Sequence, residues 1–253
     1  MSEQETGARI PEDDPVAAEL RQAVHAGDIE AVRVLLRAHP ALVTARFVSR
    51  RGGTGTALHD VAGWPGYYPN GPQIVRLLID AGADPNALTT SPASQPAQFS
   101  ETPLHYAASN DDADVAAALI DRGADLEVPG GSIGTPLDNA VGYACWHVAR
   151  LLVARGCRVD KAWHAAALGM RGRLGTILGS DPPPEVVSQA FWHACAAGQR
   201  RAAEYLLSRG ADLNWEPDYA HGTPLDAASG EGTQRENVIA WLRELGARSA
   251  DSG

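Results

Sequence analysis

A short motif that begins with threonine recurs along the chain and constrains the fold more than any other feature. The copies read Thr-Ala-Leu-His at 56–59, Thr-Pro-Leu-His at 102–105, and Thr-Pro-Leu-Asp at 135–138 and 223–226. Leucine-rich stretches that end in Gly-Ala-Asp or a variant of it recur at 77–86, 119–127, 151–160 and 206–214. Thr102 and Thr135 are 33 residues apart. A fixed period of this length predicts a stack of similar structural units.

The parts of the repeat together describe a pair of helices. Threonine caps the N-terminus of a helix, and proline fits its first turn. The leucine pairs fall on one face of a second helix, and the following glycine ends that helix in a left-handed cap. A helix pair of this kind has an apolar face that it cannot bury alone, so the units must stack on one another.

The two recurring motifs, TPLH and GADxN, resemble those of the ankyrin-repeat family over roughly residues 16–250. The resemblance implies an all-α ankyrin-repeat solenoid of about seven helix-pair units with short β-hairpin loops. Units five and six are degenerate, because Ala-Trp-His-Ala-Ala at 162–166 and Phe-Trp-His-Ala-Cys at 191–195 stand where the motif is expected. In this family the motif histidine, here His59 and His105, is usually structural and bonds adjacent turns.

The pattern predicts a single domain over residues 12–250, preceded by a flexible acidic tail at 1–11. Residues 12–50 are expected to form an N-terminal capping unit. Thr56 and Thr102 are 46 residues apart, which is longer than the repeat. We place the extra residues in two insertions, at 64–72 between the helices of one unit and at 88–101 before the next.

The charge of the chain narrows the classes of partner. Asp and Glu number 31 against 21 Lys and Arg, for a net charge of −10. Nucleic acids and anionic membranes attract basic surfaces, so neither is an expected partner. No apolar run reaches the roughly 18 residues of a membrane span, and the polar N-terminus does not resemble a signal peptide. The odd number of cysteines, none in a CxxC motif, suggests a reduced, cytoplasmic protein. The single lysine among many arginines hints at a GC-rich bacterial genome.

The inner helices of the ankyrin family form one wall of a concave groove. The residue after the motif histidine and the residue four positions later share a helix face that looks into this groove. Along the chain the first of these positions holds Asp60, Tyr106, Asn139, His164 and His193, a more polar and titratable set than packing requires. The predicted ligand-binding residues of the groove and its insertion are Trp64, Tyr67, Tyr68, Tyr106, Asn110, Asn139 and Tyr143.

Two functions remain open from the sequence. The first is a binding protein that uses its concave groove for a small molecule or a protein partner. The second is a cofactor-independent enzyme on a small metabolite, a dehydratase or lyase, an isomerase or a hydrolase. In that reading His164 and His193 would act as general acid and base, with Asp60 as a further base. Neither a cofactor nor a metal is expected, because no nucleotide-binding or zinc-ligand motif occurs. A merely solvated groove is the plain alternative to both functions.

Overall fold

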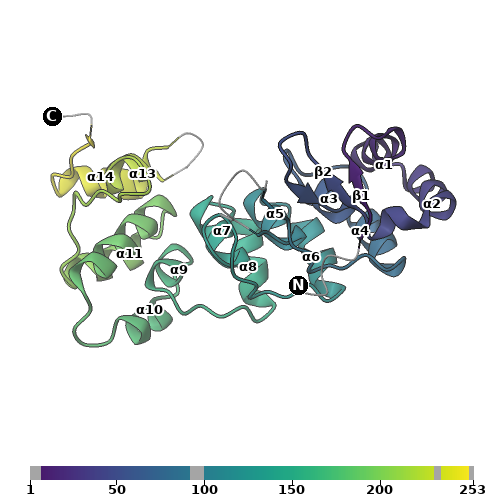
Figure 1. Cartoon of the computed structure of the whole chain (residues 1–253). Helices are drawn as coiled ribbons and strands as arrows, with labels where there is room; N and C mark the ends of the chain where they lie inside the picture. Colours follow the sequence, from purple (N-terminus) through teal and green to yellow (C-terminus); the bar gives the residue numbers. More distant parts are fainter. Residues whose placement is uncertain (1–6, 92–99, 231–234, 251–253) are drawn as a thin grey trace. The chain divides into compact units, whose positions relative to one another are not determined.

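The computed structural model describes residues 7–91, 100–230 and 235–250, and these residues contain fourteen α-helices and three short strands (Figure 1). The fold is all-α, and its helices stack in successive pairs, as the repeat predicts. Contacts divide the chain into two compact units, unit 1 at Met1–Cys157 and unit 2 at Arg158–Gly253. We describe each unit by itself, although the sequence pattern predicted one domain. The number of complete ankyrin repeats stays a prediction.

Unit 1 contains four successive helix pairs. The inner helices α3, α5 and α7 contact one another in series, and so do the outer helices α4, α6 and α8. Stacking buries the motif leucines Leu58, Leu104 and Leu137 completely. The helices are α1 (Pro15–Ala26), α2 (Ile29–Ala38), the 3-10 helix η2 (Pro40–Val43), α3 (Ala57–Ala62), α4 (Gly71–Asp80), α5 (Pro103–Ser109), α6 (Ala113–Asp121), α7 (Pro136–Gly142) and α8 (Trp146–Ala154).

A small sheet covers the start of unit 1. Its strands are β1 (Arg9–Pro11), β2 (Arg46–Val48) and β3 (Thr54–Gly55), in that order. Strand β1 runs parallel to β2 with Ile10 opposite Phe47, and β2 runs antiparallel to β3. Residues 9–11 therefore form a strand, although the polar sequence suggested that they belong to a tail, because β2 supplies backbone partners that a local sequence pattern does not reveal. Residues 1–6 lie outside the described residues.

The threonine motif works as a reciprocal cap in the unit 1 repeats. The hydroxyl of Thr102 accepts a hydrogen bond from the backbone N–H of His105, and the His105 Nδ1 accepts one from the backbone N–H of Thr102. The other ring nitrogen of His105, Nε2, lies 3.0 Å from the carbonyl oxygen of Gly134 in the next repeat. Asp138 caps Thr135 with its carboxylate in the same way. The motif histidine thus bonds adjacent turns, as expected from the resemblance.

Unit 2 keeps the helix pairs although its motifs are degenerate. Neither α9 nor α11 has a side-chain N-cap, so packing of their apolar faces maintains them without the threonine. Phe191, Ala165 and Ala194 are fully buried in this core. The helices are α9 (Ala162–Ala167), α10 (Arg171–Leu178), α11 (Pro184–Ala196), α12 (Arg200–Ser208), α13 (Pro224–Ala228) and α14 (Glu236–Glu244).

The first insertion, 64–72, connects α3 to α4 and is tied to the repeats on both sides. Asn70 donates from Nδ2 to the carbonyl oxygen of Gly27 in the preceding pair. The backbone N–H of Tyr67 donates to the Asp112 carboxylate at the start of α6. Of the second insertion, 88–101, residues 92–99 lie outside the described residues; Thr54 and Thr90 form a bridge at its beginning.

Candidate functional site

The inner side of unit 1 contains a cavity of about 430 Å³. Residues from α1, the small sheet, α3, the segment 89–91 and α5 contribute to its wall. Three carboxylates line it, those of Glu12, Asp60 and Glu101. The other lining residues are Arg21, His25, Phe47, Ser49, Gly53, Thr54, Gly55, His59, Gly63, Trp64, Thr89, Thr90, Ser91 and Tyr106.

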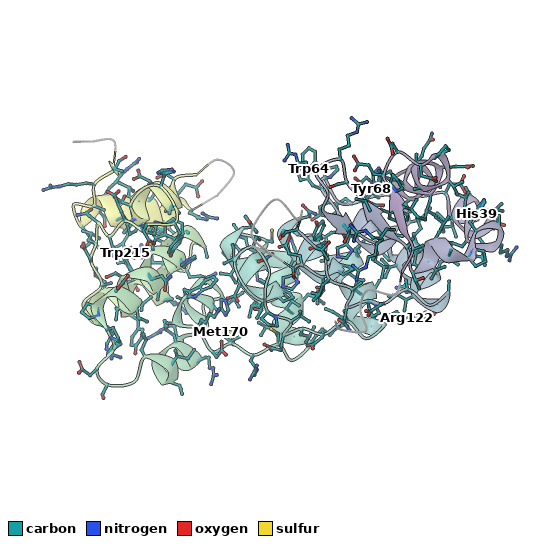
Figure 2. All side chains as sticks on the ribbon, in the orientation of Figure 1. His39, Trp64, Tyr68, Arg122, Met170 and Trp215 are labelled. Atoms are coloured by element: carbon teal, nitrogen blue, oxygen red, sulfur yellow. The ribbon has the colours of Figure 1, made fainter. Side chains whose placement is uncertain are left out.

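A second cavity of about 260 Å³ adjoins the first, because Trp64, Glu101 and Tyr106 line both. Its remaining wall consists of Ser109, Asn110, Ser132 and Tyr143. We call the two cavities together the Glu101 groove. Trp64 lies at the surface of unit 1 (Figure 2). Its exposed fraction is 84%, and that of Tyr143 is 51%. The groove therefore combines exposed aromatic side chains with carboxylates.

Asp60 lies in this groove and forms an ion pair with α1. Its Oδ1 is 3.3 Å from Nε of Arg21, and about a quarter of its side chain remains exposed. Burial raises the pKa of Asp60 to about 6, and the positive charge of Arg21 only partly opposes this effect. The carboxylate is therefore ionised at neutral pH and already has a cationic partner.

Tyr106 lines the larger cavity together with Asp60 and Glu101. Its ring packs edge-on against His59 in α3, with centroids 5.2 Å apart. Burial raises the pKa of Tyr106, and the negative charges of Glu101 and Asp60 raise it further. The phenol therefore stays neutral at physiological pH, and the negative charges around it favour a cation in the groove.

Glu101 is the groove residue that sequence reasoning missed. Its Oε1 accepts hydrogen bonds from the backbone N–H of Ser132 and from Nδ2 of Asn139, each at 3.0 Å. Its own backbone N–H donates to Thr89 Oγ1, and its carbonyl oxygen accepts from the backbone N–H of Thr89. One signal could have revealed it, since the residue before the motif threonine is glycine at 55, 134 and 222 but glutamate at 101.

The two asparagines predicted to bind a ligand act differently. Asn139 is fully buried and divides its amide hydrogen bonds between Glu101 and Ser109, so it positions the Glu101 carboxylate. Asn110 lines the smaller cavity and donates from Nδ2 to the carbonyl oxygen of Ala62. A ligand in the groove can reach Asn110, whereas it meets Asn139 only through Glu101.

The two tyrosines of the insertion do not line the Glu101 groove. They line a separate cavity of about 290 Å³ beside the start of α6. The Tyr67 hydroxyl donates to the carbonyl oxygen of Asp111, and the Tyr68 hydroxyl donates to that of Trp64. Tyr67 and Tyr68 therefore brace the segment that presents Trp64, and they do not form a common aromatic wall with it.

His164 and His193 belong to unit 2, whereas Asp60 belongs to unit 1. Both imidazoles are buried, at 2% and 5% exposure. The ring of Trp163 contacts both imidazoles, with centroids 4.1 Å and 4.8 Å away. Burial, with a smaller effect of His164, lowers the pKa of His193 to about 3. A histidine that stays neutral at physiological pH is a poor general acid, and neither imidazole lines the cavities described above.

The remaining reactive side chains do not form a second site. Burial raises the pKa of Cys195, and burial followed by the charge of Asp111 raises that of Cys145 to about 11. Both thiols therefore stay protonated and unreactive at neutral pH. Within residues 7–91, 100–230 and 235–250, no three His, Cys, Asp or Glu side chains gather as metal ligands would. None of the described helices has the length and apolar character needed to span a membrane.

Stacked helix pairs with threonine caps and a groove on the inner side define a helical repeat protein. Residues 67–162 match the family described as ankyrin repeats, in three copies, so this part of the chain consists of ankyrin repeats. The crystal structure of the ankyrin-repeat domain of Bcl-3, described as a unique member of the IkappaB family, is similar at 25% identity, with a TM-score of 0.49. The match covers 89% of this chain and 97% of that one. No curated protein matches the sequence. Ankyrin repeats are typical of protein-interaction modules.

Proposed function

We propose that the chain is a protein-binding module and that the Glu101 groove receives an extended peptide segment of its partner. The observation that carries this proposal is the position of Trp64, which is 84% exposed where the two cavities meet. Contiguous exposed apolar surface often marks a site of protein interaction, and tryptophan and tyrosine supply much of the energy of protein interfaces.

A protein segment suits this groove better than a small metabolite does. A small-molecule pocket encloses most of its ligand between buried walls. Here Trp64 and Tyr143 are both more than half exposed, so they would remain largely wet beside a small ligand. A peptide that runs from the larger cavity into the smaller one would cover both rings. The negative charge of the chain, −10 in total, favours a basic partner.

Selection of peptides from a random displayed library tests this proposal. We expect wild-type protein to enrich a set of related peptides, and Trp64→Ala to bind each of them at least about tenfold more weakly, as loss of a central aromatic contact does. Val34→Ala is the matched control, because it shortens a half-exposed apolar side chain of unit 1 outside the groove. The proposal fails if no enriched peptide depends on Trp64, or if both variants bind alike.

A further inference from the structure

Of the three carboxylates in the Glu101 groove, Glu101 alone has no cationic partner among the described residues. Glu12 is 3.7 Å from Nε of Arg50, and Asp60 is 3.3 Å from Nε of Arg21. An ionised carboxylate in a partly enclosed wall loses hydration, and it is stabilised when a cation takes the place of the lost water. The Glu101 carboxylate can therefore accept one positively charged group from a ligand.

The hydrogen bonds of Glu101 leave one oxygen for that group. Both donors within reach, the Ser132 N–H and the Asn139 amide, bond to Oε1. The described residues donate no hydrogen bond to Oε2. Because Oε1 and the backbone are fixed at several points, the position of Oε2 is fixed as well. A carboxylate oxygen that is held in place before the ligand arrives loses little entropy on binding.

Three aromatic residues line the groove together with Glu101. Trp64 and Tyr106 share both cavities with Glu101, and Tyr143 completes the wall of the smaller one. The Tyr143 hydroxyl is 3.2 Å from the Ser132 hydroxyl, so the residue whose backbone N–H holds Glu101 also holds this ring. Aromatic faces attract cations through their quadrupole, most strongly for tryptophan.

We infer that the Glu101 groove binds an arginine side chain of the partner protein, with the guanidinium donating to Glu101 Oε2 and stacking on Trp64. This inference rests on the proposed function and names the chemistry that the groove recognises. Arginine fits better than lysine for two reasons. A planar guanidinium stacks on an aromatic ring, and it is more weakly hydrated than an ammonium group, so it gives up less water on entering the groove.

Fluorine NMR of protein labelled with 5-fluorotryptophan tests the inference at the residue concerned. The chain has six tryptophans, and the Trp64 signal is the one that disappears in Trp64→Phe. The probes are N-acetyl-arginine amide, the neutral isostere N-acetyl-citrulline amide, and N-acetyl-lysine amide, at constant ionic strength. We expect the arginine probe to shift the Trp64 signal saturably, with a Kd of ~1 mM or above, as suits a single side chain. The lysine probe should bind more weakly and the citrulline probe should give no saturable shift.

The variant Glu101→Gln should weaken binding of the arginine probe by about tenfold or more, because it removes a charge-assisted hydrogen bond. Glu19→Gln is the control, since it makes the same change of charge at an exposed position of α1. Equal binding of arginine and citrulline probes, tighter binding of the lysine probe, or unchanged affinity of Glu101→Gln would overturn the inference. The comparison of probes on unaltered protein remains decisive if Glu101→Gln fails to fold.

The two proposals fail in different ways. Selected peptides that depend on Trp64 but contain no arginine would overturn the arginine site and leave the peptide-binding function in place. Binding of the arginine probe at Trp64, without any Trp64-dependent peptide, would overturn the peptide-binding function and leave the cation site.

Discussion

The imidazole of His25 stacks on the phenol ring of Tyr68, with ring centroids 4.2 Å apart and planes inclined by 8°. This contact joins helix α1 to the insertion between α3 and α4. The Tyr68 hydroxyl donates to the carbonyl oxygen of Trp64. The stack therefore helps to hold the segment 64–70, which contains the exposed Trp64.

Replacing Tyr68 tests this role of the stack. Tyr68→Leu should lower the free energy of unfolding by about 1–2 kcal/mol, through the lost ring contact and buried area. It should also speed proteolytic cleavage within 64–70. Tyr68→Phe keeps the ring and should change the free energy by less than about 1 kcal/mol. Urea denaturation and limited proteolysis measure the two effects. Equal loss in both variants would mean that the hydroxyl, and not the stack, holds the segment.

The raised pKa of Asp60 gives a prediction about pH. Its pKa is about 6 in the folded protein and near 3.8 when unfolded. The folded state therefore binds this proton more tightly, and stability is lost as pH rises from about 4 to 6. Above pH 6, Asp60→Asn should be more stable than wild type, by about 1 kcal/mol since the side chain is partly exposed.

Urea midpoints of wild type and Asp60→Asn at pH 7 and pH 4 measure this difference. The advantage of the variant should disappear at pH 4, where wild-type Asp60 is largely protonated. A variant that is less stable at pH 7 would show that the ion pair with Arg21 outweighs the cost of burial.

The lowered pKa of His193 predicts the opposite dependence of stability on pH. The folded protein binds this proton only near pH 3, whereas the unfolded chain binds it near pH 6.5. Stability should therefore be complete above pH 6.5 and fall as the pH drops toward 3. His193→Gln should flatten this fall between pH 7 and 5, and His221→Gln, at an exposed position of unit 2, should not. Denaturant midpoints against pH would contradict the prediction if all three proteins had the same slope.

The buried cysteines predict slow thiol chemistry. Cys145, Cys157 and Cys195 are 6%, 6% and 0% exposed. In native protein at pH 8, Ellman's reagent should modify them far more slowly than in unfolded protein, where three thiols should react at once. A rapid native reaction of one thiol would contradict the prediction, because it would show an accessible thiolate.

The sequence located much of the groove but could not show how each side chain is used. Asp60 and Tyr106 line it from helices α3 and α5, where the spacing of the motif places them. Trp64 and Tyr143 line it from just beyond the C-terminal ends of α3 and α7. Asn139 comes from the same column but is turned into the core, where its amide holds Glu101. The helical period gives the face of a residue, and hydrogen bonding between repeats decides what it does there.

Two further expectations needed contacts that no local pattern contains. The insertion carries Tyr67 and Tyr68 away from the groove, because its bonds to Gly27 and Asp112 lie in neighbouring helix pairs. The imidazoles of His164 and His193 pack against Trp163 and are closed to solvent. The sequence pattern of a polar residue on the inner face of a helix is the same whether its side chain faces an open groove or is buried by neighbouring side chains.

The repeat by itself determined the architecture, since a helix pair with one apolar face must stack on its like whatever the surface residues are. It also determined which residues cap each helix, because capping is local. The tertiary structure alone decided which groups line the groove and how they are held. Glu101 becomes a candidate cation site only because Ser132 and Asn139, 31 and 38 residues away, donate to one of its carboxylate oxygens, while no described residue donates to the other. Such distant contacts depend on how the repeats stack, and the order of residues within one repeat does not contain them.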